Sequence, residues 1–432
     1  MHGRSHVVGR SVFVVVAAVG ACGAAVFGAV ALAVSSFPRI DLGLDPELQA
    51  GPAAQTRFDT AAVRGRTLFW WARLPARATS APAIANGLLY VRDRDGALDA
   101  FDATNGVSRW RMPLGPGSRS GVDFAPVVAG DTVYATGWDG TLYALDAATG
   151  AVRWTARVGD GGLVATGGFP VTVAGAVVYV DAHGISAFDA TTGHPRWTTS
   201  TGTGSGVDPA MSSYSMPVVA DGAVFVGGDD GAVYALDAAT GALRWRSASV
   251  AVGGSAGAAT LVPGLGPTSS VAVAGNVVYA AGLDGALHAF DVATGTARWN
   301  APIGVVNAFG SAPVVIDGTV AVQSDEALHA FDAVTGAPRW TSDLLPGDLF
   351  SFVPPVPTTG ALYVVGRDAL LHEVDARTGA TLWTAGHRAP PPHDQPPIGS
   401  DVLAVPPAIA GDVMYLASGD GALYAYRLDG TP

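Results

Sequence analysis

The sequence predicts an all-β fold: an eight-bladed β-propeller of four-stranded antiparallel blades, preceded by one N-terminal transmembrane helix. The first observation is a segment of the form Leu-Tyr-Ala-Leu-Asp-Ala-x-Thr-Gly-x-x-x-Trp, which recurs along most of the chain. Its Trp residues follow one another at spacings of 44, 43, 48, 54, 41 and 43 residues, a period that suits one propeller blade. The second is an uncharged apolar run near the N-terminus. The repeated residues are Trp110, Trp154, Trp197, Trp245, Trp299, Trp340 and Trp383.

Each repeat has the pattern of one four-stranded sheet. The unit at residues 126–154 contains three short β-rich runs separated by turn residues, and its Trp begins a fourth. In five units an Asp-Gly pair follows the second run, which predicts a two-residue hairpin with positive φ. The sixth and seventh units carry Asp325-Glu326 and Asp368-Ala369 there, which predicts another turn type. The five pairs are Asp95-Gly96, Asp139-Gly140, Asp230-Gly231, Asp284-Gly285 and Asp420-Gly421.

The last blade is expected to combine both ends of the propeller sequence. An eighth repeat begins near Pro407 and stops without its Thr-Gly and its Trp. The aromatic run TLFWWARL at residues 67–74 precedes the first unit, and we expect it to supply the missing outer strand. Joining the two ends within one blade closes the ring and removes two exposed sheet edges. The propeller is therefore predicted to span residues 67–430.

The N-terminal region differs from the repeats. Residues 11–37 carry no charge and are long enough to cross ~30 Å of hydrocarbon, which predicts a transmembrane anchor. Arg4 and Arg10 precede this run, so the positive-inside bias places a stub of residues 1–10 in the cytoplasm. The propeller is then extracytoplasmic, held at the cell membrane by a single pass and a linker at residues 38–66.

Two alternatives to a retained anchor remain open. Ala31-Leu32-Ala33 offers a site for signal-peptide cleavage, although the apolar run is about twice the length of an ordinary signal core. Cys22 ends a sequence suited to lipid attachment, but a long uncharged run follows it where a lipoprotein would have a polar tether.

Charge and cysteine content limit the partners and the means of stabilisation. The chain has 24 basic and 36 acidic residues, and the net charge of −12 argues against binding to nucleic acid or to anionic membrane surfaces. Cys22 is the only cysteine and lies in the apolar run. The propeller must therefore be held together by blade packing without a disulfide bond.

The repeats resemble PQQ-type β-propeller repeats, the blades of quinoprotein alcohol dehydrogenases and of the bacterial outer-membrane assembly propeller (BamB). The resemblance covers residues 67–430 and rests on the Asp-x-x-Thr-Gly-x-x-x-Trp spacing, as at residues 146–154. Thr occupies its place in six of seven copies, and Asn105 replaces it in the first. The resemblance implies that each repeated Trp docks against the neighbouring blade. Many relatives bind no quinone.

The repeated polar residues have a structural explanation. Asp146 and Thr149 fall in the predicted turn between the third and fourth strands, where short polar side chains bond to nearby backbone N–H groups. A catalytic group is needed once, whereas these residues recur in blade after blade, as packing elements must.

A quinone-dependent enzyme is the main alternative. The resemblance implies that such an enzyme adds an adjacent Cys-Cys disulfide, a calcium ion held by acidic and amide side chains, and a catalytic Asp. The cysteine pair is missing from this sequence, as are Ser-His-Asp, HExxH and Walker motifs. We therefore predict no catalytic residue and no cofactor, with PQQ and calcium belonging to the alternative.

Two groups of residues invite a metal-binding interpretation. The acidic hairpins at 93–96 and 229–231 could attract calcium, but the loop pattern of a calcium site is incomplete. His288, His329 and His372 occupy the place that Tyr fills in other blades. Each histidine then belongs to its own sheet, so we expect the three to pack and not to converge on a metal.

Loop lengths favour one face of the disk for binding. The crossings between blades should lie on the same face as the Asp-Gly hairpins, and those at 197–217, 245–271 and 383–407 are long. Polar and aromatic residues gather in the crossings, which predicts a mildly acidic, aromatic-lined funnel. In the competing interpretation the Asp residues cap turns and the Phe residues plug the channel mouth. The candidate binding residues are Asp123, Phe124, Trp138, Asp208, Tyr214, Asn307, Phe309, Asp348 and Phe350.

The favoured function is that of a membrane-anchored extracytoplasmic scaffold that binds an envelope protein or a small ligand without catalysis. A PQQ- and calcium-dependent quinoprotein dehydrogenase and a ligand-sensing ectodomain are the alternatives. A sensor is disfavoured because the short cytoplasmic stub can hardly signal unaided.

Overall fold

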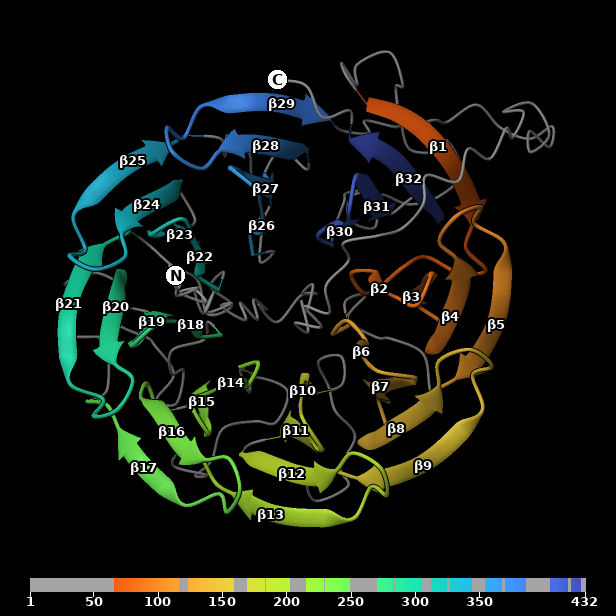
Figure 1. Ribbon diagram of the computed structural model, residues 1–432, viewed down its shortest axis with the longest axis horizontal. Helices are drawn as coiled ribbons and strands as arrows, with labels where there is room; N and C mark the ends of the chain where they lie inside the picture. The colour runs from red at the N-terminus through yellow and green to blue at the C-terminus, as the bar shows by residue number, and fades with distance from the viewer. Residues whose placement is uncertain are drawn as a thin grey trace, which may run out of the picture.

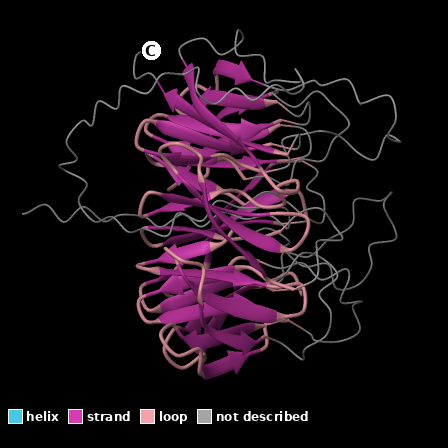
Figure 2. Cartoon of the chain, turned by 90° about the vertical axis from the view of Figure 1, so that its right-hand side faces the viewer, coloured by secondary structure: helices cyan, strands magenta, loops and turns pink. Residues whose placement is uncertain are grey.

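A computed structural model describes most of the repeat region. The described residues are 66–115, 123–158, 169–182, 184–202, 215–228, 230–248, 270–282, 284–304, 312–324, 327–343, 354–366, 370–385, 405–418 and 421–428. The regular elements within them are β-strands, which form eight four-stranded antiparallel sheets. Figure 1 shows these sheets arranged radially as a ring, and Figure 2 shows the ring edge-on as a disk. The eight-bladed propeller is thus confirmed.

The blades share one strand order from the centre outwards. The innermost strands are β2 (Ala83–Ala85), β6 (Val127–Ala129), β10 (Val171–Ala174), β14 (Val218–Ala220), β18 (Ala272–Ala274), β22 (Val314–Ile316), β26 (Val356–Thr358) and β30 (Ala408–Ala410). The second strands are β3 (Leu88–Arg92), β7 (Thr132–Thr136), β11 (Val177–Asp181), β15 (Ala223–Gly227), β19 (Val277–Ala281), β23 (Thr319–Gln323), β27 (Ala361–Val365) and β31 (Val413–Ala417).

The outer half of each blade follows the same order. The third strands are β4 (Ala97–Asp102), β8 (Thr141–Asp146), β12 (Ile185–Asp189), β16 (Val233–Asp237), β20 (Ala286–Asp291), β24 (Leu328–Asp332), β28 (Leu371–Asp375) and β32 (Ala422–Leu428). The outermost strands are β5 (Ser108–Pro113), β9 (Val152–Arg157), β13 (Pro195–Thr199), β17 (Leu243–Arg246), β21 (Ala297–Pro302), β25 (Pro338–Ser342), β29 (Thr381–Ala385) and β1 (Arg66–Arg73). Blade 1 contains β2–β5, blades 2 to 7 follow in chain order, and blade 8 contains β30–β32 and β1.

The ring closes in blade 8, as the sequence predicts. β1 pairs antiparallel with β32, so the first strand of the propeller completes the sheet that the last three begin. The pairing runs from Arg66 opposite Leu428 to Arg73 opposite Ala422, with one register shift between Leu68 and Trp70. Every blade therefore has four strands, and the third strand of blade 8, β32, is paired on both sides.

The hydrophobic core is divided among the interfaces between neighbouring blades. The second strands are buried along nearly their whole length, as in β7, because each sheet is covered on both faces by its neighbours. The outermost strands alternate exposed and half-buried residues, as in β9, because only one of their faces contacts the next blade. Hydrophobic clusters accordingly join residues of adjacent blades, such as Tyr90 of β3 and Leu145 of β8.

The hairpins between the second and third strands differ from the two-residue prediction. In blade 2 the N–H of Gly140 donates to the carbonyl of Gly137 (3.1 Å). The N–H of Gly137 donates to the carbonyl of Thr141 (2.7 Å). The loop thus has three residues and ends at Gly140, whose φ is 76°. This is a tight turn followed by a left-handed glycine, so only the Gly of the Asp-Gly pair needs positive φ. The turns at Asp325-Glu326 and Asp368-Ala369 lie outside the described residues.

Two-residue turns do occur, at the other end of the blades. Asn86 and Gly87, between β2 and β3, have φ values of 54° and 74°. Asp221-Gly222 and Asp317-Gly318 show the same pair of positive φ values. Consecutive left-handed residues define the hairpin turn that favours Asn-Gly and Asp-Gly. The predicted two-residue turn therefore lies between the first and second strands and not between the second and third, and both turns end in glycine.

No helix within the described ranges is long and apolar enough to cross a membrane. The stub at 1–10, the apolar run at 11–37 and all of the linker before Arg66 lie outside those ranges.

Candidate functional site

The strand order gives the disk two distinct faces. The N–H groups of Leu114, Val158 and Ile303, just after outermost strands, bond to the carbonyls of Gly96, Gly140 and Gly285 in the hairpins. The crossings to the next blade therefore leave from the face that carries these hairpins, as expected from the sequence. We call it the hairpin face. The opposite face, the turn face, carries the Asp-x-x-Thr-Gly turns between the third and fourth strands.

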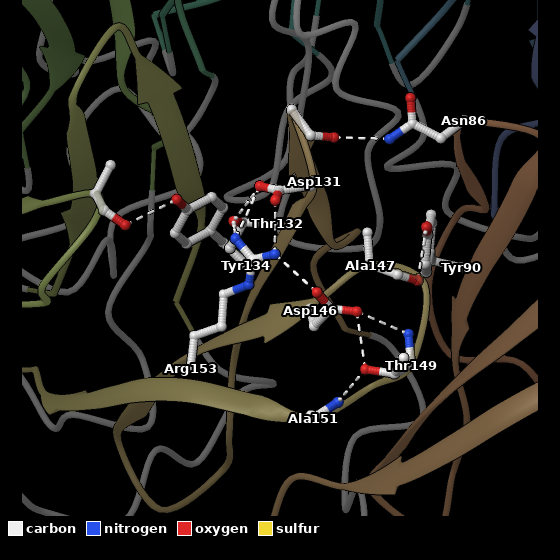
Figure 3. A network of polar contacts seen from close by, with 12 residues as sticks. Asn86, Tyr90, Asp131, Thr132, Tyr134, Asp146, Ala147, Thr149, Ala151 and Arg153 are labelled. Atoms are coloured by element: carbon white, nitrogen blue, oxygen red, sulfur yellow. Dashed lines mark hydrogen bonds and ion pairs between the residues drawn. The ribbon is translucent and has the colours of Figure 1, made fainter.

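The Asp-x-x-Thr-Gly motif builds the turn face. Asp146 Oδ1 accepts hydrogen bonds from the backbone N–H (2.9 Å) and the hydroxyl (2.8 Å) of Thr149 (Figure 3). The structural role expected for these residues is confirmed, since the carboxylate and the hydroxyl close the turn on themselves. The same two bonds occur in Asp189–Thr192, Asp237–Thr240, Asp291–Thr294, Asp332–Thr335 and Asp375–Thr378.

An arginine that the sequence analysis did not single out completes the motif. Arg153 donates to Asp146 Oδ2 and Asp131 Oδ2, both at 2.7 Å (Figure 3). These bonds, with those from Thr149, lower the pKa of Asp146 to about 2. The signal was present, because an Arg precedes the Trp in six of the seven repeats. The other pairs are Asp102–Arg109, Asp189–Arg196, Asp237–Arg244, Asp291–Arg298 and Asp332–Arg339.

The motif glycine receives the indole ring of the preceding blade. Gly150 has a φ of 72°, and a Cβ placed on it would lie 2.6 Å from Cε3 of Trp110. The indole therefore packs directly on the backbone, which explains why glycine is needed there for space as well as for conformation. Equivalent contacts join Trp70–Gly106, Trp154–Gly193, Trp197–Gly241, Trp245–Gly295, Trp299–Gly336 and Trp340–Gly379.

Two donors of one blade share a carbonyl of the next. The Trp110 indole N–H (3.0 Å) and the Tyr90 hydroxyl (3.1 Å) both donate to the carbonyl of Ala147, and their rings lie 5.8 Å apart. Trp154, Trp197, Trp245 and Trp340 also donate to a carbonyl of the following blade. Trp383 is half-buried in the cluster that joins blades 7 and 8. The seams of Trp110, Trp154, Trp197, Trp245 and Trp340 thus combine aromatic packing with a directed indole hydrogen bond.

Three of the nine candidate binding residues lie within the described ranges, and all three are buried. Asp123, Phe124 and Trp138 are 1%, 4% and 3% exposed. They lie between blades 1 and 2 at the hairpin face, where Phe124 joins the hydrophobic cluster that extends to blade 5. The structure therefore places them beneath that surface as support. Asp208, Tyr214, Asn307, Phe309, Asp348 and Phe350 lie outside the described residues.

Asp123 is the centre of a buried polar network. Its Oδ1 accepts the indole N–H of Trp138 (2.7 Å), and its Oδ2 accepts the hydroxyl of Thr79 (2.6 Å). The guanidinium of Arg92 lies 3.6 Å from Oδ1 and donates to the carbonyl of Thr136 (2.7 Å). Burial raises the pKa of Asp123, and this upward shift is opposed by Arg92 and by the two hydrogen bonds. The network connects β3, the crossing before β6, and the second hairpin.

A second charged group lies beside this network in blade 1. Arg111 of β5 contacts Asp99 of β4 (2.9 Å) and Asp93 at the start of the hairpin (2.5 Å). Asp99 stands where the other blades carry a Tyr, His or Ser opposite the outermost strand. Aligning the repeats would have shown this, because blade 1 alone places an acid at that position. The equivalent residues are Tyr143, Ser186, Tyr234, His288, His329, His372 and Tyr424.

The three histidines remain in separate sheets, as expected. His288 contacts Asp284 (2.9 Å) through Nε2, His329 contacts Ser324 (3.1 Å), and His372 contacts Thr384 (2.9 Å). Each partner belongs to the same blade as its histidine. Across the described ranges, no group of three or more His, Cys, Asp or Glu side chains could hold a metal ion.

The fold and its repeated seams define a propeller of PQQ-type repeats. The sequence matches the family described as Outer membrane protein assembly factor BamB over residues 61–116, 96–342 and 327–432. The chain belongs to this family. A comparison with curated proteins finds no match.

Solved structures share the fold at low identity. BamB from Moraxella catarrhalis has a TM-score of 0.61 and 20% identity, covering 85% of this chain and 99% of its own. Quinohemoprotein alcohol dehydrogenase from Comamonas testosteroni has a TM-score of 0.60 and 16% identity, covering 86% and 78%. The computationally designed Ika8 protein has a TM-score of 0.62 and 15% identity, covering 83% and 99%. At these identities the likeness shows the fold alone.

Proposed function

We propose that this protein is a membrane-anchored extracytoplasmic scaffold that binds an envelope protein or a small ligand on its hairpin face, without catalysis. One observation carries the proposal. The repeated Trp, Gly, Asp, Thr and Arg residues are all engaged in the seams and in the turn face. The departures from the repeat, in blade 1 and in the long crossings, belong to the hairpin face. Variable loops on a rigid frame are typical of a recognition surface.

The direction of β1 supports this choice of face. Arg66, where β1 begins, pairs with Leu428, whose N–H bonds to the carbonyl of Asp412 in a turn on the turn face. After β1, the N–H of Leu74 bonds to the carbonyl of Gly421 on the hairpin face. The chain therefore enters the propeller from the turn face. If residues 11–37 anchor the protein, the hairpin face is directed away from the membrane and is available to a partner.

The described residues do not fit the cofactor of the dehydrogenase relatives. Calcium takes six to eight oxygen ligands, and no described cluster supplies such a set. The buried carboxylates of blades 1 and 2 at the hairpin face, Asp93, Asp99 and Asp123, already bond to arginine, indole or hydroxyl groups. Asp181 in blade 3 accepts the backbone N–H groups of Gly184 and Ser215. We therefore derive no reaction step through a quinone. The net charge of −12 also favours a partner other than nucleic acid.

The experiment is crosslinking of the full chain in intact cells, followed by identification of the captured partner. The test variant shortens the crossings at 249–269 and 386–404. The matched control replaces exposed aliphatic side chains on the turn face with serine at Val107, Val152 and Leu243. We expect capture to be lost in the test variant and kept in the control. Equal capture by both, or oxidation of an alcohol by the chain reconstituted with PQQ and calcium, would contradict the proposal.

A further inference from the structure

Three carboxylates of blade 1 lie around a single guanidinium group. Arg111 Nη1 lies 2.9 Å from Asp99 and 2.5 Å from Asp93, and its Nη2 lies 3.6 Å from Asp95. One guanidinium thus faces three carboxylates. Arg92 lies 3.6 Å from a fourth carboxylate, Asp123, and the N–H of Arg94 within the hairpin bonds to the carbonyl of Arg77. We call Asp93, Asp95, Asp99 and Arg111 the acid cluster.

Burial makes this imbalance significant. The side chains of Asp93 and Asp99 are 0% and 1% exposed, whereas that of Asp95 is 68% exposed. Water can screen the charge of Asp95 but not those of the other two, and an uncompensated buried charge is costly. Burial raises the pKa of Asp99 to about 7, Arg111 opposes the shift, and the neighbouring Asp93 adds to it. The carboxyl group of Asp99 is therefore the natural place for a proton.

The acid cluster is built into the first hairpin. Asp93 Oδ1 accepts the N–H of Ala97 (3.0 Å), and the carbonyl of Asp93 accepts the N–H of Gly96 (3.0 Å). A shift of the Asp93 side chain therefore disturbs the bonds that close the hairpin. The N–H of Leu114, at the start of the crossing to blade 2, bonds to the carbonyl of Gly96 (2.9 Å). The hairpin and this crossing must then move together.

The cluster also reaches the second blade. Asp93 follows Arg92, which is 1% exposed and contacts Asp123, and Asp123 holds the indole of Trp138 in the second hairpin. Nε and Nη2 of Arg92 have no hydrogen-bond partner among the described residues. The negative charge of Asp93 contributes to the raised pKa of Asp123. A charge change at Asp93 and Asp99 is therefore felt by the groups that support the hairpins of blades 1 and 2.

We propose that Asp99, buried beside Asp93 against Arg111, holds a proton and that its loss loosens the 93–96 hairpin, making blades 1 and 2 a pH-sensitive part of the hairpin face. When Asp99 is protonated, Asp93 and Asp99 together carry one negative charge opposite Arg111. The repulsion between two carboxylates is then absent. When deprotonated, two buried negative charges share one guanidinium. Other blades lack this pair, because a Tyr, His or Ser stands in place of Asp99. Regulation of partner binding by this proton rests on the proposed function, whereas the proton itself does not.

The sign of the effect follows from the raised pKa. A carboxyl group that holds its proton more tightly in the closed hairpin than in the open one stabilises the closed form in acid. That stabilisation is complete below about pH 4, the ordinary range of Asp, and is lost as the pH rises to about 7. The opening equilibrium of the hairpin should therefore increase by up to about tenfold per pH unit within this window and then level off.

The test is amide hydrogen exchange of the full chain from pH 5 to pH 8, corrected for base catalysis. In the unaltered protein, protection of the Gly96 and Ala97 amides should fall with rising pH. Asp99→Asn should abolish this dependence, and the matched control Asp95→Asn, on the exposed side of the same cluster, should keep it. The same dependence in Asp99→Asn, or no dependence in the unaltered protein, overturns the proposal.

A second measurement does not depend on a folded variant. Carboxyl carbon shifts of the unaltered, Asp-labelled chain should include at least one titration midpoint near pH 7. Midpoints that all lie below pH 5 overturn the proposal. If this midpoint is present but no partner is captured in cells, the proposed function fails and the proton site stands. If a partner is captured and the midpoint is absent, only the proton site fails.

Discussion

Trp70 donates its indole N–H to the carbonyl of Ala103 at 2.9 Å, although the two residues belong to the last and the first blade of the ring. The hydroxyl of Tyr415 donates to the same carbonyl (3.2 Å), so this seam repeats the contacts between Trp110, Tyr90 and Ala147. Trp70 is thus the eighth docking indole, supplied by the N-terminal strand. The structure identifies it where the repeat in the sequence shows only seven.

Trp70→Ala should destabilise the closed ring. Trp70 is 9% exposed, and removing a buried indole costs about 3–5 kcal/mol. Urea unfolding of the full chain should show a lower midpoint. Trp70→Phe keeps a ring in the seam and should have a smaller effect. An unfolding curve for Trp70→Ala that overlays the unaltered one would show that the closure does not depend on this contact.

Gly150→Ala should be more harmful than Gly130→Ala. Both glycines have positive φ, 72° and 61°, so both alanines suffer the same backbone strain of about 1–2 kcal/mol. Only at Gly150 would the new Cβ meet Trp110, at 2.6 Å, whereas nothing lies within 4 Å at Gly130. Overpacking adds about 1–3 kcal/mol, which thermal unfolding of the two variants should resolve. Equal loss in both would leave backbone strain as the whole effect.

The turn face should lose stability in acid. Hydrogen bonds from arginine and threonine lower the pKa values of Asp146, Asp237 and Asp291 to about 2. A depressed folded-state pKa contributes stability above the ordinary Asp range, and this stability is lost as the pH falls from about 4 to 2. The free energy of unfolding should decline over that window. Asp146→Asn should make the decline shallower, and an unchanged slope would assign the acid sensitivity to other carboxylates.

Asp123→Ala should destabilise the protein by about 3–5 kcal/mol, because removing one member of a buried ion pair leaves the other uncompensated. Arg92 would lose its counterion, and Trp138 and Thr79 would lose their acceptor. The matched control is Asp131→Ala, which removes an exposed partner of Arg153 and should change stability little. Denaturant unfolding compares the two. Equal small losses would mean that the network is not an essential support of blades 1 and 2.

The turn face should lie nearer the membrane than the hairpin face. A random coil as long as the predicted linker would reach about 30 Å, short enough to bias the orientation of the disk. In a Cys22→Ser background, single-cysteine labels at Val107 (turn face) and Asp95 (hairpin face) can be compared by quenching from lipid headgroups. Stronger quenching is expected at position 107. The reverse order would contradict both the anchor and the assigned orientation.

Much of this architecture could be predicted from the local sequence pattern of the repeats. The alternating apolar runs, the turn residues and the recurrence of Trp110 and its equivalents every 41 to 54 residues define the blade and the number of blades, because these signals recur with each unit. The hairpin types were less predictable, since an Asp-Gly pair suits both a two-residue turn and a three-residue loop ending at Gly140. The burial of Asp123 and Trp138 was also hidden, because a polar residue in a loop gives no local sign of which blade covers it.

The amino-acid sequence by itself determined that eight similar sheets form a ring and that aromatic side chains join them, because the same local pattern of strands, turns and Trp occurs in each repeat. Only the tertiary structure decided which residues of different blades meet. It brought Trp70 onto Ala103, and it placed Arg111 among Asp93, Asp95 and Asp99. Such contacts depend on register and on the packing of neighbouring sheets, and these are properties of the assembled ring and not of any single repeat.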